Sequence, residues 1–209
     1  MKEVDVNNWV RSKLFHFFKD YEDPFFGLTA NVDVSAFHTL CKQNNYSFGL
    51  SVLYAATKAI NQIPELRLRI KNGKVYDFDV ISPGTTILHP DSTFSFCFFE
   101  MKNSLFSFLE AAKPVLKQHF DKDGIDGRAE DLNVIHGSAI PWVSFTQIKH
   151  ARRFGSEDSI PKITFGKYYT FDEKLLMPVS IEINHALADG YHAGLFFEKF
   201  QFFLNSTEL

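Results

Sequence analysis

Two kinds of apolar spacing divide the chain into strands and helices. Apolar residues at every second position from Gly27 to Val34 predict a strand. Spacings of three and four from Leu50 to Ile60 predict a helix that Ser47 caps and Pro64 ends. The same helical spacing is present over residues 9–18, 102–119 and 192–204. We therefore expect four helices, one in each of these segments.

The other apolar stretches resemble strands. Asn72-Gly73 between two alternating segments predicts a hairpin, whereas Pro114 predicts a bend or an interruption of its helix. Strands are expected over residues 66–70, 74–80, 85–89, 93–99, 140–146, 162–170 and 174–183, with a surface loop over 121–131. Hairpins mixed with helical inserts favour a layered α/β (α+β) fold, in which helices pack on a mixed, largely antiparallel sheet.

Composition supports one folded unit. The chain has 209 residues, of which 45% are hydrophobic, so we expect a single domain over residues 1–209. A formal charge of −3 argues against a nucleic-acid partner. There is no apolar run of about 20 residues and no signal segment, so we expect no membrane partner and a cytoplasmic location. The 24 phenylalanines suggest an apolar ligand site or a subunit interface.

No spacing of cysteine or histidine predicts a metal site. Cys41 and Cys97 are far apart and belong to no Cys-x-x-Cys pattern, so we expect buried thiols. Most of the eight histidines also lack a metal-ligand spacing, and we assign no metal.

The segment around His185 carries the candidate chemistry. Apolar residues alternate from Met177 to Ile183, and His185 falls on the same phase. If the strand persists that far, the imidazole points to the covered side of the sheet. A shielded, neutral histidine can accept a proton near pH 7. The alternative is a core histidine, with Asp189 as a cap for the last helix.

Four segments resemble the chloramphenicol acetyltransferase family. Residues 183–192 contain the family signature His-x-x-x-Asp-Gly, which other CoA-dependent acyltransferases share. Residues 8–18 resemble its Trp-x-Arg opening, residues 139–145 its Pro-Trp-x-Ser-Phe strand, and residues 163–169 its Thr-x-Gly-Lys-Tyr strand. The resemblance implies the CoA-dependent acyltransferase fold.

The resemblance also implies roles for individual residues. His185 matches the general base, and Ser144 matches the serine that stabilises the tetrahedral oxyanion. Asp189 and Arg11 match an ion pair that supports the site, and Thr164 matches a threonine near the reacting centre. Lys167 and Tyr168 match positions that bind CoA. The acceptor pocket is expected to include Phe25, Phe26, Leu28, Phe94 and Phe96.

The implied activity is O-acetyl transfer from acetyl-CoA, as co-substrate, to a hydroxyl of chloramphenicol or a similar small acceptor. The resemblance further implies a homotrimer with active sites at the subunit interfaces, and antibiotic resistance as the setting. Two alternatives remain open. One is an acyltransferase of the same fold with a different acceptor, and the other is a non-catalytic CoA-binding homologue.

Overall fold

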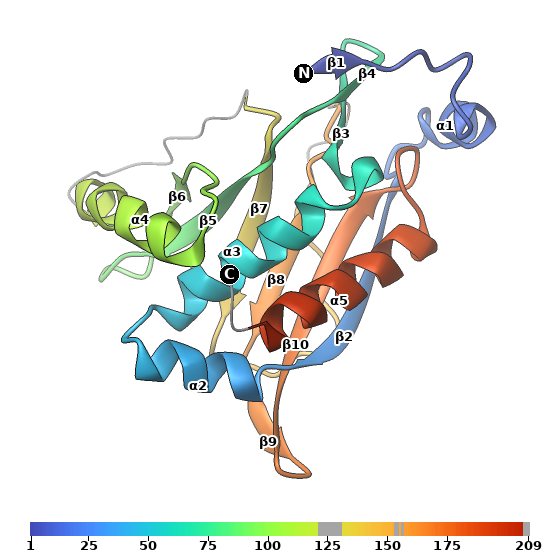
Figure 1. Ribbon diagram of the computed structural model, residues 1–209. Coiled ribbons are helices and arrows are strands. Elements are labelled where there is room, and N and C mark those ends of the chain that lie inside the picture. The colour runs from blue at the N-terminus through green and yellow to red at the C-terminus, as the bar shows by residue number, and fades with distance from the viewer. Residues whose placement is uncertain (121–130, 153–154, 156, 207–209) are drawn as a thin grey trace.

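The computed structural model describes residues 1–120, 131–152, 155 and 157–206, and places α2, α3 and α5 against one face of a large sheet (Figure 1). The helices are α1 (Ser12–Phe18), α2 (Ser35–Gln43), α3 (Phe48–Asn61), the 3-10 helix η1 (Pro64–Arg67), α4 (Leu105–Phe120) and α5 (Gly190–Asn205). The strands are β1 (Lys2–Glu3), β2 (Phe25–Asp33), β3 (Leu68–Lys71), β4 (Lys74–Asp77), β5 (Ser82–Leu88), β6 (Phe94–Phe98), β7 (Val134–Ile140), β8 (Lys162–Gly166), β9 (Tyr169–Phe171) and β10 (Lys174–Asn184).

The large sheet has the order β2-β10-β8-β7-β5-β6, and β9 pairs with β10 at one end. The β5–β7 and β7–β8 pairs are parallel, and the other pairs are antiparallel. A small sheet of β1, β4 and β3 contains the expected hairpin. The prediction of a mixed, largely antiparallel sheet packed with helices is therefore confirmed.

Strand β10 shows why the two faces of the sheet differ. Val179, Ile181 and Ile183 belong to the main hydrophobic core under the helices. Ser180 and Glu182 alternate with them and point to the opposite face, which we call the outer face. Both residues are still buried, because other parts of the chain cover this face as well.

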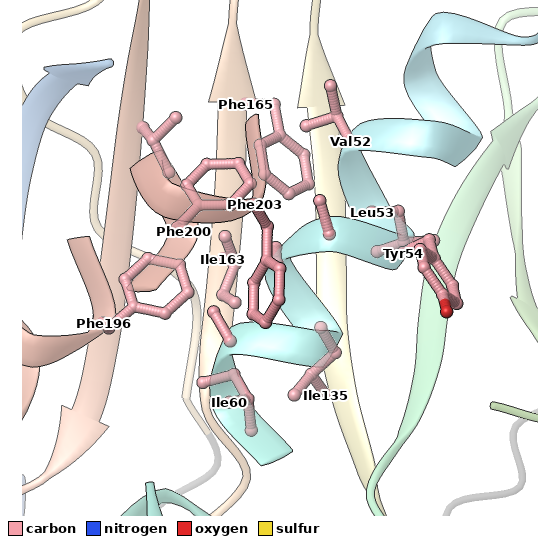
Figure 2. Close-up of a cluster of buried hydrophobic side chains, with 14 of the residues drawn as sticks. Val52, Leu53, Tyr54, Ile60, Ile135, Ile163, Phe165, Phe196, Phe200 and Phe203 are labelled. Atoms are coloured by element: carbon pink, nitrogen blue, oxygen red, sulfur yellow. The ribbon is translucent and has the colours of Figure 1, made fainter. Parts of the chain in front are cut away.

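Phenylalanines of α5 fill much of the main core. Figure 2 shows Phe196, Phe200 and Phe203 packed between the sheet and α3. The facing side chains include Val52, Leu53, Ile60, Ile135, Ile163 and Phe165. Burying each large apolar side chain contributes about 1.5–3 kcal/mol, so this contact holds α5 firmly on the sheet.

Three element predictions need correction. The strand expected over 140–146 is wrong: β7 ends at Ile140, where Pro141 has no N–H to continue the ladder. The strand expected over 162–170 is divided into β8 and β9. Helix α4 is continuous through Pro114, so the interruption considered there is wrong.

The other predicted helices and strands are confirmed, with ends shifted by a few residues, whereas β1, η1 and most of β7 were not predicted. The loop expected over 121–131 lies outside the described residues except for its last residue. In the part of the chain that the structure describes, no helix is long and apolar enough to cross a membrane.

Candidate active site

His185 lies in a turn, one residue beyond the end of β10. The strand therefore does not continue to His185. The turn forms because Asn184 Oδ1 accepts a hydrogen bond from the backbone N–H of Ala186 at 2.9 Å, while its carbonyl accepts from Leu187 at 3.0 Å. The backbone N–H of His185 donates to the carbonyl of Pro24 at 2.7 Å, which ties the turn to the start of β2.

Two phenyl rings hold the imidazole of His185. The Phe18 ring, from α1, stacks on it with a centroid distance of 4.1 Å and an interplanar angle of 5°. The Phe26 ring, from β2, lies at 4.5 Å and is tilted by 42°. Nδ1 is buried and has no hydrogen-bond partner among the described residues. The ring is thus oriented by packing, as a fixed proton acceptor requires.

The loop that carries His185 is tied to the N-terminal segment by an ion pair. Arg11 Nη1 lies 2.6 Å from Asp189 Oδ2, and the two side chains are 8% and 29% exposed. Arg11 immediately precedes α1, which carries Phe18, and Asp189 immediately precedes α5. One contact therefore holds both sides of the His185 site.

Asp189 also caps α5, so both roles considered from the sequence apply to it. Its Oδ1 accepts from the backbone N–H of Tyr191 at 3.1 Å, and His192 Nδ1 hydrogen-bonds to the same oxygen at 2.9 Å. Burial alone would raise the pKa of Asp189. The hydrogen bond from Arg11 and the charges nearby outweigh burial and lower this pKa below its ordinary value.

Ser144 follows β7 in an exposed segment that is fastened to the end of β8. Its Oγ donates to the carbonyl of Lys167 at 2.6 Å, and the Lys167 N–H donates to the carbonyl of Val143 at 2.9 Å. The Phe145 ring packs close to Gly166, where an added Cβ would lie 2.9 Å from the ring. A side chain at position 166 would therefore collide with this ring, so the segment of Ser144 can lie this close only because residue 166 is glycine.

His185 and Ser144 lie at opposite ends of the sheet within one chain. Phe165 of β8 pairs with Val179 of β10, six residues before His185. Lys167, to which Ser144 is bonded, lies two residues further in the other direction. Eight residues of strand span about 26 Å, so one copy of the chain does not bring the two side chains together.

Thr164 lies on the outer face and is fully buried, with 0% exposure. Its Oγ1 is 3.0 Å from His150 Nε2. His150 Nδ1 is 2.8 Å from Glu182 Oε1, which also accepts from the His150 backbone N–H at 2.9 Å. Arg152 binds the other Glu182 oxygen. In the single chain, Thr164 is thus hydrogen-bonded to His150, whose side chain is partly exposed to solvent.

Sequence reasoning missed this buried polar cluster of Thr164, His150, Glu182 and Arg152. Burial alone would raise the pKa of Glu182, but hydrogen bonds from the side chain and backbone of His150, together with Arg152, lower it from 4.5 to about 2. A glutamate inside a buried strand was the available signal, because a buried carboxylate needs partners. Its partners lie in a segment without periodicity, so the pattern could not name them.

A cavity of about 980 Å³ adjoins the segment that leads to Ser144. Lys167, Tyr168 and Pro141 line it together with Ser47 and Phe48, where α3 begins. The Tyr168 ring lies 5.7 Å from the Phe48 ring. A cation and aromatic faces at one cavity suit a phosphate and an adenine, so the two residues expected to bind CoA lie where a nucleotide could fit.

The five expected acceptor residues do not lie together in one chain. Phe25, Phe26 and Leu28 belong to β2, and Phe94 and Phe96 belong to β6, at the opposite edge of the sheet. Five strand spacings separate these edges by about 24 Å. Phe26 packs on the main core, whereas Phe25 and Leu28 border a second, smaller cavity.

Comparison with known proteins shows one family. The model of the family described as "Chloramphenicol acetyltransferase" matches residues 1–201. A chloramphenicol acetyltransferase of Proteus mirabilis is 30% identical over 199 residues, which cover 95% of this chain and 92% of that protein. Chloramphenicol acetyltransferase 2 of Haemophilus influenzae is 28% identical, covering 95% and 94% respectively.

Solved structures agree with this result. A chloramphenicol acetyltransferase structure has a TM-score of 0.91 and 30% identity, covering 97% of this chain and 98% of that one. A dihydrolipoamide acetyltransferase of Azotobacter vinelandii has a TM-score of 0.65 at 15% identity, covering 92% and 86%. The second likeness shows a shared fold alone.

Proposed function

Because the chain belongs to the chloramphenicol acetyltransferase family and is an acetyl-CoA-dependent acetyltransferase, we propose that it acetylates a hydroxyl of chloramphenicol or a similar small acceptor. His185 is the general base and Ser144 stabilises the oxyanion. The observation that carries this assignment is the imidazole of His185, which Phe18 and Phe26 hold in a loop that the Arg11–Asp189 ion pair ties to the N-terminal segment.

The reaction requires one proton acceptor and one hydrogen-bond donor. His185 takes the hydroxyl proton as the acceptor oxygen bonds to the thioester carbon, an assistance typically worth about 10²–10⁴-fold in rate. Ser144 leaves the Lys167 carbonyl and donates to the oxyanion, which can contribute about 3 kcal/mol. The carbon–sulfur bond then breaks, and the departing thiolate recovers the proton from His185.

Two copies of the chain would complete each site. The separation of about 26 Å along the strands supports a site in which His185 of one copy faces Ser144 of a neighbour. The same arrangement would bring the β2 residues Phe25 and Leu28 toward the β6 residue Phe94 of another copy. The shared site requires self-association, and we propose the homotrimer that the family resemblance implies, with Lys167 and Tyr168 binding the CoA nucleotide.

A transfer assay tests the proposal. Purified protein with acetyl-CoA and chloramphenicol should release free CoA, measured as thiol. His185→Ala should lower kcat by at least about 10²-fold and leave acetyl-CoA binding, measured by calorimetry, nearly unchanged. His16→Ala is the matched control, because His16 is an exposed histidine of α1 whose Nδ1 hydrogen-bonds to the backbone carbonyl of Ser12.

Unchanged turnover in His185→Ala would refute the assignment of the base. Binding of acetyl-CoA without thiol release, with any acceptor tried, would instead favour the non-catalytic CoA-binding homologue. Release of thiol with other acceptors but not with chloramphenicol would favour an acyltransferase of different specificity, and the surroundings of Phe25 give a structural reason to test for it.

A further inference from the structure

A cavity of about 300 Å³ opens on the outer face of the sheet beside β2 and β10. Phe25 and Thr29 of β2, Ser180 and Glu182 of β10, and Arg152 are among its lining residues. Phe25 pairs with Asn184, the residue before His185, so one end of the cavity lies beside the end of β10, where the turn that carries His185 begins. Its volume is at the lower end of the range for small-molecule sites, about 300–1,000 Å³.

The Phe25 ring at this cavity makes a cation–π contact with Arg152. The guanidinium carbon of Arg152 lies 3.2 Å from the centroid of the Phe25 ring, and Lys162 Nζ approaches to 5.0 Å. Arg152 is also ion-paired with Glu182 and with Asp158. An aromatic acceptor that stacks on this face of Phe25 would have to displace a paired cation, which is costly.

The charges around the cavity balance. Lys149 Nζ lies 3.0 Å from Asp23 Oδ2 at its rim, and Arg152 faces Glu182 inside. Two cations and two anions give no net attraction for an ionic ligand. They do place hydrogen-bond donors and acceptors side by side.

Several polar groups at the cavity have hydrogen-bonding capacity to spare. Arg152 is 10% exposed, and its buried Nε makes no hydrogen bond among the described residues, although it lies 3.7 Å from Asp23 Oδ1 in an ion pair. The hydroxyls of Thr29, Thr146 and Ser180 also line the cavity, and the structure shows no hydrogen bonds from them to other described side chains or backbone. A lining of this kind suits a ligand whose groups both donate and accept.

We propose that the preferred acceptor is a small, neutral polyhydroxyl compound of about monosaccharide size, bound by hydrogen bonds in this cavity, and that an aromatic acceptor such as chloramphenicol is a poorer substrate because Arg152 covers this face of Phe25. A sugar or cyclitol hydroxyl can donate and accept at each oxygen, which matches the mixed lining. This inference rests on the proposed acetyl transfer and specifies the acceptor for it.

Acceptor competition tests the inference. Thiol release from acetyl-CoA would be measured with glucose, inositol and glycerol, with serine and lactate as charged probes, and with chloramphenicol. We expect kcat/KM for the best neutral polyol to exceed that for chloramphenicol by about tenfold or more. The double variant Arg152→Leu/Glu182→Gln removes the pair without leaving one charge alone, and should shift the ratio toward chloramphenicol by about tenfold.

A matched control removes an ion pair elsewhere. Arg67 and Asp77 pair at 3.4 Å beside β4, so Arg67→Leu/Asp77→Asn should leave the acceptor ratio unchanged. The ratio compares two acceptors on the same protein, so a loss of stability cancels. Preference for chloramphenicol or for a charged probe by the wild type, or an unchanged ratio in the Arg152 variant, would overturn the inference.

A binding measurement distinguishes failure of the acceptor site from failure of acetyl transfer. Saturation-transfer NMR would measure contact of the same compounds with the wild-type protein in the absence of turnover. Binding of polyols but not of chloramphenicol, with no thiol release, would sustain the acceptor site and refute acetyl transfer. Thiol release with chloramphenicol and with none of the polyols would sustain acetyl transfer and refute the polyol site.

Discussion

Glu182 makes the fold sensitive to acid by an amount that the structure allows us to work out. Burial alone would raise the pKa of Glu182, but hydrogen bonds from His150 and Arg152 lower it from 4.5 to about 2 in the folded protein. A tenfold change in proton affinity is worth about 1.4 kcal/mol, so ionised Glu182 contributes about 3 kcal/mol to the free energy of unfolding. This contribution is present above pH 4.5 and is lost as the pH falls toward 2, because the unfolded chain takes up the proton first.

Urea unfolding of the wild type and of Glu182→Gln, followed from pH 7 to pH 3 at one protein concentration, measures this contribution. The variant leaves Arg152 without its carboxylate and should be about 3 kcal/mol less stable at pH 7. The two free-energy curves should converge as the pH falls. Parallel curves, or a Glu182 carboxyl signal in NMR that titrates near pH 4.5, would refute the reasoning.

Two further substitutions test the supporting contacts. Asp189→Asn breaks the partly buried pair with Arg11 and should cost about 2–3 kcal/mol in the free energy of unfolding, between the values for surface and buried pairs, while lowering kcat; wild-type stability would contradict it. Lys167→Ala should raise KM for acetyl-CoA about tenfold with little change in kcat, and an unchanged KM would remove Lys167 from the CoA site.

The sequence predicted the parts of the fold that follow a period. Alternation along β10 located the strand and its core face, and the His-x-x-x-Asp-Gly segment pointed to His185 and Asp189. The end of the strand was harder to predict, because it depends on the side chain of Asn184 folding back onto the next turn. Whether Asp189 caps a helix or pairs with Arg11 also could not be decided locally, and it does both.

The surroundings of the acceptor residues could not be predicted from spacing. Phe25 reads as one apolar residue in an alternating strand, whereas its ring carries a guanidinium from a segment more than 100 residues away. Arg152 is placed there by Glu182 and Asp158, through contacts between a loop and a sheet. No periodicity records such contacts, because each depends on the packed fold.

On the proposed arrangement, the distance between His185 and Ser144 leaves a monomer without a complete active site. Dilution that dissociates the copies would then lower the activity. A substitution in the contact between copies would lower it as much as a substitution of His185. Natural selection for turnover would therefore preserve the assembly along with the chemistry. Two inactive variants, one lacking each group, could restore a working centre when they assemble together.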